Sequence, residues 1–369
     1  DQFDKLAQIQ PLYNSSIEDK YNIYLCHNGH INITSKLLTF CKKHHISTTY
    51  NSDSGLFYNI FRYCLNYFTD DLSKIHPTQL QYKISIIIGW MCNICKGAYS
   101  IICVIEGIGM ICFKDNNGIR PLSYGIKGRR LLVASESIAI SSQNYTDIRE
   151  LQHNEILFYR FGDSTYNVFM KDKYITIRDG QYELTPCVFE WIYLARSESI
   201  IYDVPVYNVR LAMGQLLAEK IKCKVKDWDT YDYVIPVPDT SRPYALSISN
   251  ELNIPYVEAI IKNRYIYRTF IMDTQEKRKS NLKRKLNVIP SIISGKNIII
   301  VDDSIVRGNT MNHIIELLKQ TNVGKITVVS AAPQIINKNV YGIDLPTREE
   351  LISYKYNSDE LAAKYEIEH

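Results

Sequence analysis

In the second half of the chain, short apolar segments alternate with longer amphipathic ones, and this alternation restricts the fold more than any other feature. Three segments have the length and the β-branched content of buried strands, and two carry apolar residues at helical spacing. The strand segments are 232–238, 296–303 and 324–333, and the helical segments are 244–253 and 309–322. Such alternation predicts a parallel α/β sheet, because parallel strands need long crossover connections.

The first half of the chain has antiparallel character instead. Segment 21–31, YNIYLCHNGHI, is typical of a strand, and its Asn-Gly pair predicts a turn near the end. Segment 99–113, YSIICVIEGIGMICF, predicts two strands joined by a glycine turn. We place the boundary between the two patterns near residues 182–186, which predicts domains over 1–185 and 186–369.

The composition is that of an ordinary globular protein, with 46% hydrophobic and 22% charged residues and a formal net charge of +4. This charge does not by itself indicate a nucleic acid or a membrane as partner. Lys96 and Glu106 divide the most apolar region, 84–113, into uncharged runs shorter than the roughly 18 residues of a membrane helix. We expect a buried helix followed by a strand hairpin there.

The nine cysteines are scattered over apolar segments and no secretory signal is visible, which predicts reduced thiols in a cytoplasmic protein. Cys92 and Cys95 have CxxC spacing, which is compatible with half of a metal site or a redox pair. No second CxxC follows them, which favours two small buried residues on an apolar helix.

The stretch NIIIVDDSIVRGNTMNHIIELL, residues 297–318, places Asp302 and Asp303 at the carboxyl end of a predicted central strand. Ligands of open α/β sheets bind at that end. The loop that follows contains Gly308 and leads into a helix, whose first amide groups form a site for phosphate. Two carboxylates would repel a lone phosphate. A ribose phosphate fits both features, because carboxylates accept hydrogen bonds from its hydroxyls or face hydrated magnesium. The alternative is an acidic pair that caps a helix.

This stretch resembles the phosphoribosyl pyrophosphate (PRPP) motif of type I phosphoribosyltransferases. The sequence resembles one family, the amidophosphoribosyltransferases, more narrowly. The motifs that carry this resemblance are, in order, VIPVPDTSR, KNRYIYRTFI, KRKLN, VDDSIVRG and SAAP…YGID, and upstream of them CHNG, DNNGIRPL, ASES and FEWIYLARSES. The resemblance covers the chain from about Gln10 to its last residue. It implies α/β and α+β architecture, with a partial N-terminal-nucleophile domain (an αββα sandwich) followed by a phosphoribosyltransferase domain.

The resemblance implies three groups of PRPP-binding residues. They are Asp302 and Asp303 for the ribose and magnesium; Arg307, Gly308, Asn309 and Thr310 for the 5′-phosphate; and Asp239, Thr240, Ser241 and Arg242 for the pyrophosphate. The family has a third protein contact to magnesium, for which Thr240 is our choice. The family usually has threonine where Asn309 stands.

The basic segment IKNRYIYRTFIMDTQEKRKSNLKRKLN admits three interpretations. Aromatic residues between the cations suggest a nucleic-acid surface, and a solvated basic face is also compatible with it. The family implies a lid that closes over PRPP, with Lys262 and Arg264 contributing to the chemistry by neutralising the leaving group and by excluding water. The family has glycine where Tyr267 stands.

The upstream motifs imply a glutaminase half. Asn28 and Gly29 match an oxyanion hole, and Asp53 matches the carboxylate that holds the glutamine α-amino group. The family nucleophile is an N-terminal cysteine, whereas this sequence begins at Asp1, so we expect the glutaminase half to be incomplete. On a strand, Cys26 does not occupy the nucleophile position.

The implied reaction is displacement of pyrophosphate from PRPP by ammonia, which in the family comes from glutamine, in the first committed step of purine synthesis. Magnesium is the expected cofactor. Some family members hold an iron–sulfur cluster, and Cys187 matches one ligand, but Asn339 stands where a second would fall, so we expect no cluster. Purine nucleotides as feedback inhibitors and a homo-oligomer are also implied. We expect neither nucleic acid nor membrane as a partner. The alternative function is a non-catalytic PRPP-binding regulator.

Overall fold

The computed structural model describes residues 9–13, 20–48, 52–68, 72–171, 182–263, 286–339, 341 and 347–369. The chain divides into two compact units, and each is described by itself below. Unit 1 consists of Asp1–Glu190, Ile200–Asp203 and Asn339–Asp344, and unit 2 consists of Trp191–Ser199, Val204–Lys338 and Leu345–His369. The first passage between units therefore follows Glu190, five residues after the end of the predicted first domain.

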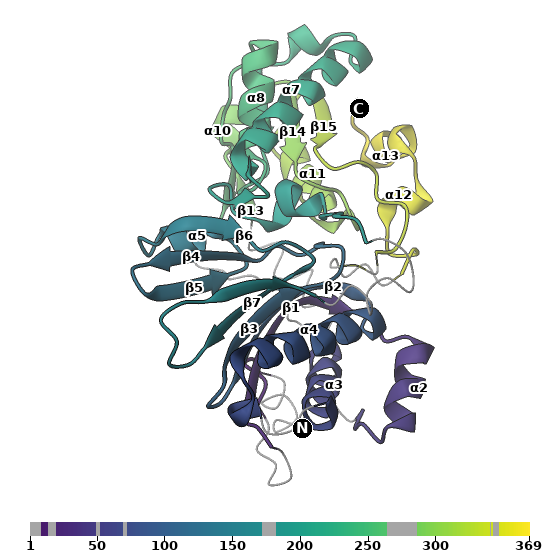
Figure 1. Cartoon of the computed structure of the whole chain (residues 1–369). Helices are drawn as coiled ribbons and strands as arrows, with labels where there is room; N and C mark the ends of the chain where they lie inside the picture. The colour runs from purple at the N-terminus through teal and green to yellow at the C-terminus, as the bar shows by residue number, and fades with distance from the viewer. Residues whose placement is uncertain are drawn as a thin grey trace. The chain divides into compact units, whose positions relative to one another are not determined.

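Unit 1 consists largely of antiparallel strands and three longer helices (Figure 1). Its elements are β1 (Ile23–Ile31), α2 (Ser35–Lys43), α3 (Asp53–Phe68), η1 (Leu72–Lys74), α4 (Pro77–Ile94), β2 (Gly97–Ile105), β3 (Gly109–Lys114), β4 (Ser123–Lys127), β5 (Arg130–Ala134), α5 (Ser137–Ser141), β6 (Thr146–Glu150), β7 (Glu155–Arg160), β8 (Asn167–Met170) and β9 (Ile200–Ile201). A π-helical turn, η3 (Glu190–Leu194), starts at the last residue of the long unit-1 segment.

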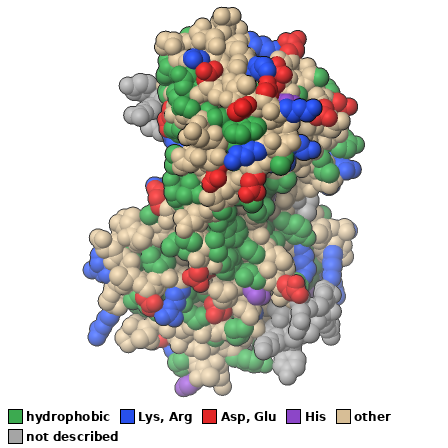
Figure 2. All heavy atoms as spheres, turned by 90° about the horizontal axis from the view of Figure 1, so that it is seen from above, with side chains coloured by type: hydrophobic (Ala, Val, Ile, Leu, Met, Phe, Trp, Pro, Cys, Tyr) green, Lys and Arg blue, Asp and Glu red, His purple; other side chains and the backbone are tan. Residues whose placement is uncertain are grey.

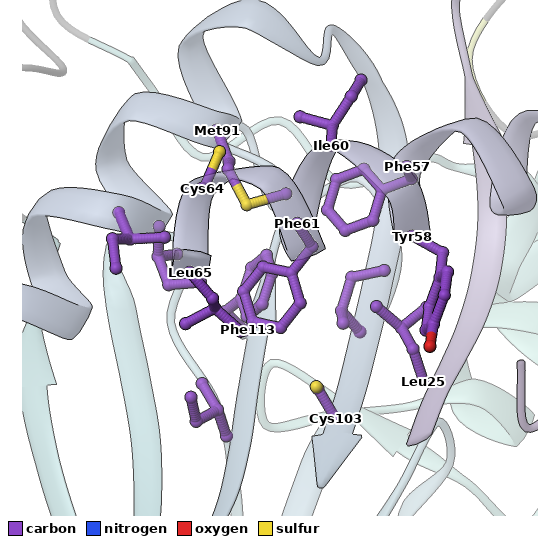
Figure 3. Close-up of a cluster of buried hydrophobic side chains, with 14 of the residues drawn as sticks. Leu25, Phe57, Tyr58, Ile60, Phe61, Cys64, Leu65, Met91, Cys103 and Phe113 are labelled. Atoms are coloured by element: carbon purple, nitrogen blue, oxygen red, sulfur yellow. The ribbon is translucent and has the colours of Figure 1, made fainter. Parts of the chain in front are cut away.

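Apart from β9, the strands of unit 1 form two sheets, with the orders β1-β2-β3-β7-β8 and β5-β4-β6. Helices α3 and α4 cover one face of the larger sheet, and α5 packs against the smaller sheet (Figure 1). The main core lies between the helices and the larger sheet, where Phe57 and Phe61 of α3 meet Leu25, Cys103 and Phe113 of the strands (Figure 3). Apolar burial of this kind stabilises the layered arrangement.

The helix and hairpin predicted over 84–113 are confirmed: α4 is apolar and largely buried, and β2 pairs antiparallel with β3 across a turn at Gly107. Cys92 and Cys95 are both buried at the end of α4, and burial raises the pKa of Cys95 well above its ordinary value. Both thiols are free. This pair fits the structural interpretation of the CxxC spacing.

The turn predicted at Asn28-Gly29 is wrong. Both residues lie within β1, where Gly29 pairs with Tyr99 of β2. Gly29 has φ +143°, and a Cβ on it would lie 2.0 Å from the carbonyl oxygen of Ala98. Glycine is needed here because a neighbouring strand approaches its backbone closely, and not because the chain reverses.

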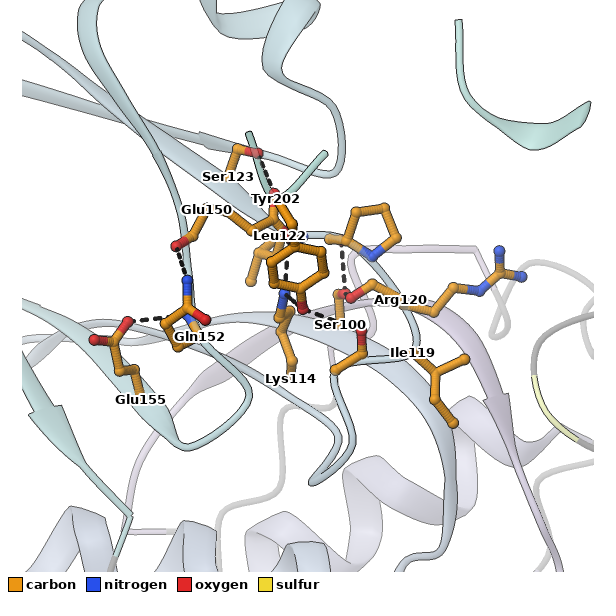
Figure 4. A network of polar contacts seen from close by, with 12 residues as sticks. Ser100, Lys114, Ile119, Arg120, Leu122, Ser123, Glu150, Gln152, Glu155 and Tyr202 are labelled. Atoms are coloured by element: carbon orange, nitrogen blue, oxygen red, sulfur yellow. Dashed lines mark hydrogen bonds and ion pairs between the residues drawn. The ribbon is translucent and has the colours of Figure 1, made fainter. Parts of the chain in front are cut away.

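A buried polar network ties the strands of unit 1 to the loop before β4 (Figure 4). The Lys114 ammonium donates to Glu150 at 2.8 Å and to the Tyr202 hydroxyl at 2.7 Å. Glu150 also accepts from the backbone of Leu122 and from the hydroxyl of Ser123. Lys114 is fully buried, and desolvation lowers its pKa despite the carboxylate beside it. Such a pair holds its surroundings in one arrangement, because breaking it would leave a buried charge.

Unit 2 has a parallel sheet with helices on both faces (Figure 1). Its elements are β10 (Val204–Pro205), α7 (Val206–Lys224), η4 (Trp228–Thr230), β11 (Tyr233–Pro236), α8 (Arg242–Leu252), β12 (Ile260–Lys262), β13 (Leu286–Val288), α10 (Pro290–Ile293), β14 (Ile298–Asp302), α11 (Asn309–Lys319), β15 (Ile326–Ser330), α12 (Ile352–Lys355) and α13 (Ser358–Tyr365).

The predicted strands and helices of the second half are all present. Strands β11, β14 and β15 pair in parallel with β14 in the middle, and all five residues of β14 are buried. One core forms with α7 and α8, and a second with α11, α12 and α13. Burial on both faces explains why β14 is a continuous apolar run with no polar alternation. No helix within the described ranges is both long and apolar enough to cross a membrane.

Candidate functional site

The central strand β14 ends at Asp302, and Asp303 follows it directly. Both side chains are largely buried. One oxygen of Asp302 accepts from the backbone N–H of Asp303 at 3.0 Å and from the hydroxyl of Ser241 at 3.5 Å. Asp303 accepts from the hydroxyl of Ser304 at 2.8 Å. The backbone carbonyls of both acids accept from the chain after β15, so the strand end is held on that side as well.

The electrostatics of this pair are unfavourable in isolation. Desolvation and the neighbouring charge of Asp303 raise the pKa of Asp302 well above its ordinary value. Desolvation also raises the pKa of Asp303 to about 6, although Ser304 and the positive charge of Arg210 oppose the shift. Raised pKa values in carboxylates at a strand end are typical of functional sites, because folding alone gains nothing from them.

Arg210 is a buried cation in this region that the sequence interpretation missed. Its guanidinium donates to the backbone carbonyls of Trp191 and Ala195 at 2.7 and 2.8 Å, and to the hydroxyl of Ser197 at 2.9 Å. The buried residues of α7 include Val206, Arg210, Gly214, Ala218 and Ile221, which follow a spacing of about four. An arginine at a core position of a helical pattern was therefore the signal that could have found it.

The predicted 5′-phosphate loop lies at the amino end of α11. Gly308 is the residue before the helix, no side chain caps the helix, and no acidic residue stands in its first turn. The helix begins at Asn309, where the predicted helical segment also begins. Asn309 is exposed and Thr310 half-buried. Uncapped amide groups at a helix start attract phosphate through hydrogen bonds and the helix dipole.

Gly308 is required at this loop for two reasons. Its φ is +74°, in the left-handed region that favours glycine, and a Cβ would lie 2.3 Å from Ile352 Cδ1. The loop is also tied to α12, because the N–H of Ile352 donates to the carbonyl of Val306 at 2.9 Å. Arg307 is paired with Glu350 at 2.5 Å. The turn is therefore held by the segment that follows β15.

The predicted pyrophosphate loop connects β11 to α8. Asp239 is exposed, Thr240 is half-buried, and Ser241 is fully buried beside Asp302. Arg242 starts α8, and its guanidinium pairs with Asp239 at 2.8 Å and with Glu258 at 2.9 and 3.2 Å. The hydroxyl of Ser241 thus links this loop to the carboxylate pair.

The start of the predicted lid segment lies next to the same loop. Lys262, the last residue of β12, donates to Asp239 at 2.5 Å. Desolvation raises the pKa of Asp239, but the hydrogen bonds and charges of Lys262 and Arg242 outweigh it, so that the net shift is downward. Arg264, Tyr267 and the rest of the predicted lid up to residue 285 lie outside the described residues.

In unit 1, the structure brings the predicted glutamine-site residues to one end of β1. Asp53 starts α3, and one of its oxygens accepts from the N–H of Ile31 at 2.8 Å, two residues after Gly29. The side-chain amide of Asn28 is exposed and donates to the hydroxyl of Ser135 at 3.0 Å. The sheet and α3 therefore place an amide donor and a carboxylate on neighbouring elements.

Two residues that the motifs did not single out support Asp53. The hydroxyl of Ser54 contacts Asp53 at 3.4 Å and His27 Nδ1 at 2.7 Å. His27 is buried, and desolvation lowers its pKa to about 4, so its ring is neutral at ordinary pH. A neutral ring of this kind orients the hydroxyl and adds no charge beside Asp53.

The remaining cysteines of interest are not activated. Cys26 lies on β1 and Cys187 lies before η3, and desolvation raises the pKa of each thiol. A raised pKa disfavours the thiolate that a nucleophile or a metal ligand needs. Over the described ranges, no group of three or more His, Cys, Asp or Glu side chains is arranged to hold a metal ion.

Proteins similar to this chain over most of its length include several amidophosphoribosyltransferases. Residues 208–344 match the phosphoribosyl transferase domain family. The amidophosphoribosyltransferases of Pasteurella multocida and Escherichia coli are 40% and 36% identical to this chain over 97% and 96% of its length, and the chain covers 68% of each relative. The solved structure of glutamine PRPP amidotransferase from B. subtilis, complexed with ADP and GMP, matches 98% of this chain and 72% of its own length, with a TM-score of 0.78 and 28% identity. The resemblance seen in the motifs is confirmed: the chain belongs to the amidophosphoribosyltransferase family, the PRPP-using pentosyltransferases of purine biosynthesis.

Proposed function

We propose that the carboxyl end of β14 and the start of α11 together form the PRPP site of unit 2. In this proposal Asp302 and Asp303 bind the ribose hydroxyls, and Arg307 to Thr310 bind the 5′-phosphate. The observation that carries the proposal is the buried acidic pair with raised pKa values beside an uncapped helix start. Hydroxyl groups and a cation would relieve the acids, while the helix would receive the phosphate.

The donor set fits a hydrated magnesium ion. Asp302 and Asp303 offer carboxylate oxygens, and the hydroxyls of Ser241 and Thr240 come from the adjoining loop. Magnesium is usually held by one or two carboxylates together with substrate oxygens and water. When bound, the ion would neutralise charge on the pyrophosphate leaving group. Thr240 as a third protein contact remains a prediction.

The reaction that we propose is displacement of pyrophosphate from PRPP by ammonia to give 5-phosphoribosylamine. The residues of this chain hold the reacting carbon in place, and Lys262 and Arg264 supply positive charge beside the leaving group. Closure of the lid segment would exclude water, which competes with ammonia for the sugar carbon. No protein nucleophile is needed at this site.

For unit 1 we propose a partial N-terminal-nucleophile glutaminase domain, of the kind that supplies the ammonia in the family. The order helix, sheet, sheet, helix supports this assignment (Figure 1). Asn28 and Gly29 would donate to the developing negative charge, and Asp53 would hold the α-amino group of glutamine. Ile31, Ser54 and His27 would keep Asp53 in position.

Regulation and location are proposed on separate grounds. The B. subtilis relative binds ADP and GMP, which supports purine nucleotides as inhibitors of this chain. The family suggests a homo-oligomer.

The nine cysteines are free, which supports a reducing cytoplasm as the location of the protein. Lysine and arginine are interspersed with acidic residues on the face shown in Figure 2, which gives no support for a nucleic-acid surface there.

The test of the transferase site is pyrophosphate release from PRPP with magnesium and ammonium as the nitrogen source, because this assay needs no glutaminase. We expect turnover by the unaltered chain and a loss of about a hundredfold or more in Asp302→Asn. Asp229→Asn, which neutralises an exposed acid of η4, is the matched control and should keep full activity. PRPP binding without any turnover would instead favour a non-catalytic regulator.

A further inference from the structure

The arginine of the pyrophosphate loop, Arg242, is paired with two acids, and one of them, Glu258, lies outside the PRPP motifs. Arg242 donates through Nε and Nη2 to the two oxygens of Glu258, at 2.9 and 3.2 Å, and through Nη1 to Asp239 at 2.8 Å. All three nitrogens of its guanidinium are therefore engaged by carboxylates. The fork-shaped pairing with Glu258 is the strongest arrangement that an arginine and a carboxylate can form.

Glu258 is held in place by its own surroundings. The hydroxyl of Tyr256 donates to it at 2.9 Å. Backbone hydrogen bonds in both directions tie residues 255–257 to Val234 of β11. The hydrogen bond from Arg242 lowers the pKa of Glu258, so the acid is ionised at neutral pH. The carboxylate thus comes from a segment aligned with the sheet, which gives it a defined position.

The charges of this cluster cancel. Asp239 and Glu258 contribute two negative charges, and Arg242 and Lys262 contribute two positive charges. An incoming pyrophosphate group therefore meets cations whose charge is already balanced, and it must compete with Glu258 for the guanidinium. Competition of this kind weakens anion binding without removing the cation.

We propose that Glu258 is a positioning residue of the transferase site that keeps Arg242 away from pyrophosphate and so weakens the binding of this product. Arg242 then acts mainly by orienting Asp239, which in turn holds Lys262. The inference rests on the proposed PRPP site and adds to it a residue that sets the affinity for the diphosphate group.

The test compares pyrophosphate inhibition and the KM for PRPP in variants of the full chain. In Glu258→Gln one of the two guanidinium donors loses its acceptor and one negative charge is lost, so the inhibition constant of pyrophosphate should fall about tenfold. The KM for PRPP should fall in parallel, because PRPP carries the same diphosphate. Tyr256→Phe, which loosens Glu258, should shift both constants less and in the same direction. Because the ion pair is exposed, neither variant should lose much stability.

Two further variants make the result specific. Glu251→Gln removes an exposed acid of α8 with the same change in net charge and should leave both constants unchanged. The effect of Glu258→Gln should disappear in an Arg242→Gln background, because the released guanidinium is then absent. An unchanged or weaker affinity for pyrophosphate in Glu258→Gln would overturn the inference. If pyrophosphate does not compete with PRPP in the unaltered chain, the proposed site itself fails.

Discussion

The buried acids at the end of β14 predict that a substitution can stabilise the fold while abolishing turnover. In Asp303→Asn the side chain keeps an oxygen that can accept from Ser304, but it carries no charge. Because burial raises the pKa of Asp303 to about 6, the ionised form is costly in the folded chain. The neutral variant should therefore be more stable than the unaltered chain at alkaline pH and in the absence of divalent cations.

The size of the expected stability gain and the pH range in which it occurs follow from the shift in the pKa of Asp303. The folded pKa lies above the ordinary value of 3.8, so the contribution of Asp303 to stability is most favourable below about pH 4 and is lost as the pH rises through about 6. A difference of about two pKa units corresponds to about 3 kcal/mol. Asp303→Asn should thus gain up to about 3 kcal/mol in free energy of unfolding at pH 8, and about half of that at pH 5.

The measurement is urea unfolding at both pH values with a chelator present. The chain has three tryptophans, Trp90 in unit 1 and Trp191 and Trp228 in unit 2. A Trp90→Phe background therefore confines the fluorescence signal to unit 2. Turnover of PRPP with ammonia, measured in parallel, should fall about a hundredfold or more.

Asp232→Asn is the control with the opposite sign. A hydrogen bond from the N–H of Asn297 lowers the pKa of Asp232, so the loss of this charge should destabilise unit 2. The reasoning is refuted if Asp303→Asn is destabilised at pH 8 as Asp232→Asn is, or if its gain does not change between pH 5 and pH 8.

Two further predictions concern the phosphate loop and the buried network. Gly308→Ala should destabilise unit 2 and raise the KM for PRPP, because the added Cβ would meet Ile352. Gly295→Ala is the control, because Gly295 has φ +71° and nothing lies within 4 Å of the added Cβ. In urea unfolding this control should show only the backbone cost of about 1 kcal/mol. Lys114→Met should cost unit 1 about 3–5 kcal/mol in urea unfolding, because it leaves the buried Glu150 charge without its partner. Adding Glu150→Gln should recover part of this loss, and an equal or larger loss in the double variant would contradict the assignment.

The sequence was sufficient for unit 2 because its signals are local. A continuous apolar run identifies β14 as a central strand, and the position of Asp302 at its end follows from the direction of the chain. The same local rule misread Asn28-Gly29 as a turn. The need for glycine there comes from Ala98 on a neighbouring strand, about seventy residues away in the chain, and no local pattern carries that information.

Arg210 and Glu258 show why the rest of the site was not predictable. Arg210 has carbonyl partners from a segment more than ten residues upstream. Glu258 reaches Arg242 only because its segment aligns with β11 in one register. Pairings of this kind depend on tertiary geometry, which a linear pattern of residue types does not encode.

The chain enters unit 2 after Glu190, returns to unit 1 for Ile200–Asp203, and then leaves again. Within the segment Ile200–Asp203 the N–H of Ile200 donates to the hydroxyl of Ser137, and the hydroxyl of Tyr202 accepts from the Lys114 ammonium. A single division of the chain therefore cannot yield two complete units: a first fragment would have to extend at least through Asp203, a second would have to begin by Trp191, and the first would still lack the unit-1 segment Asn339–Asp344. Separately expressed halves would need to carry residues 191–203 in duplicate.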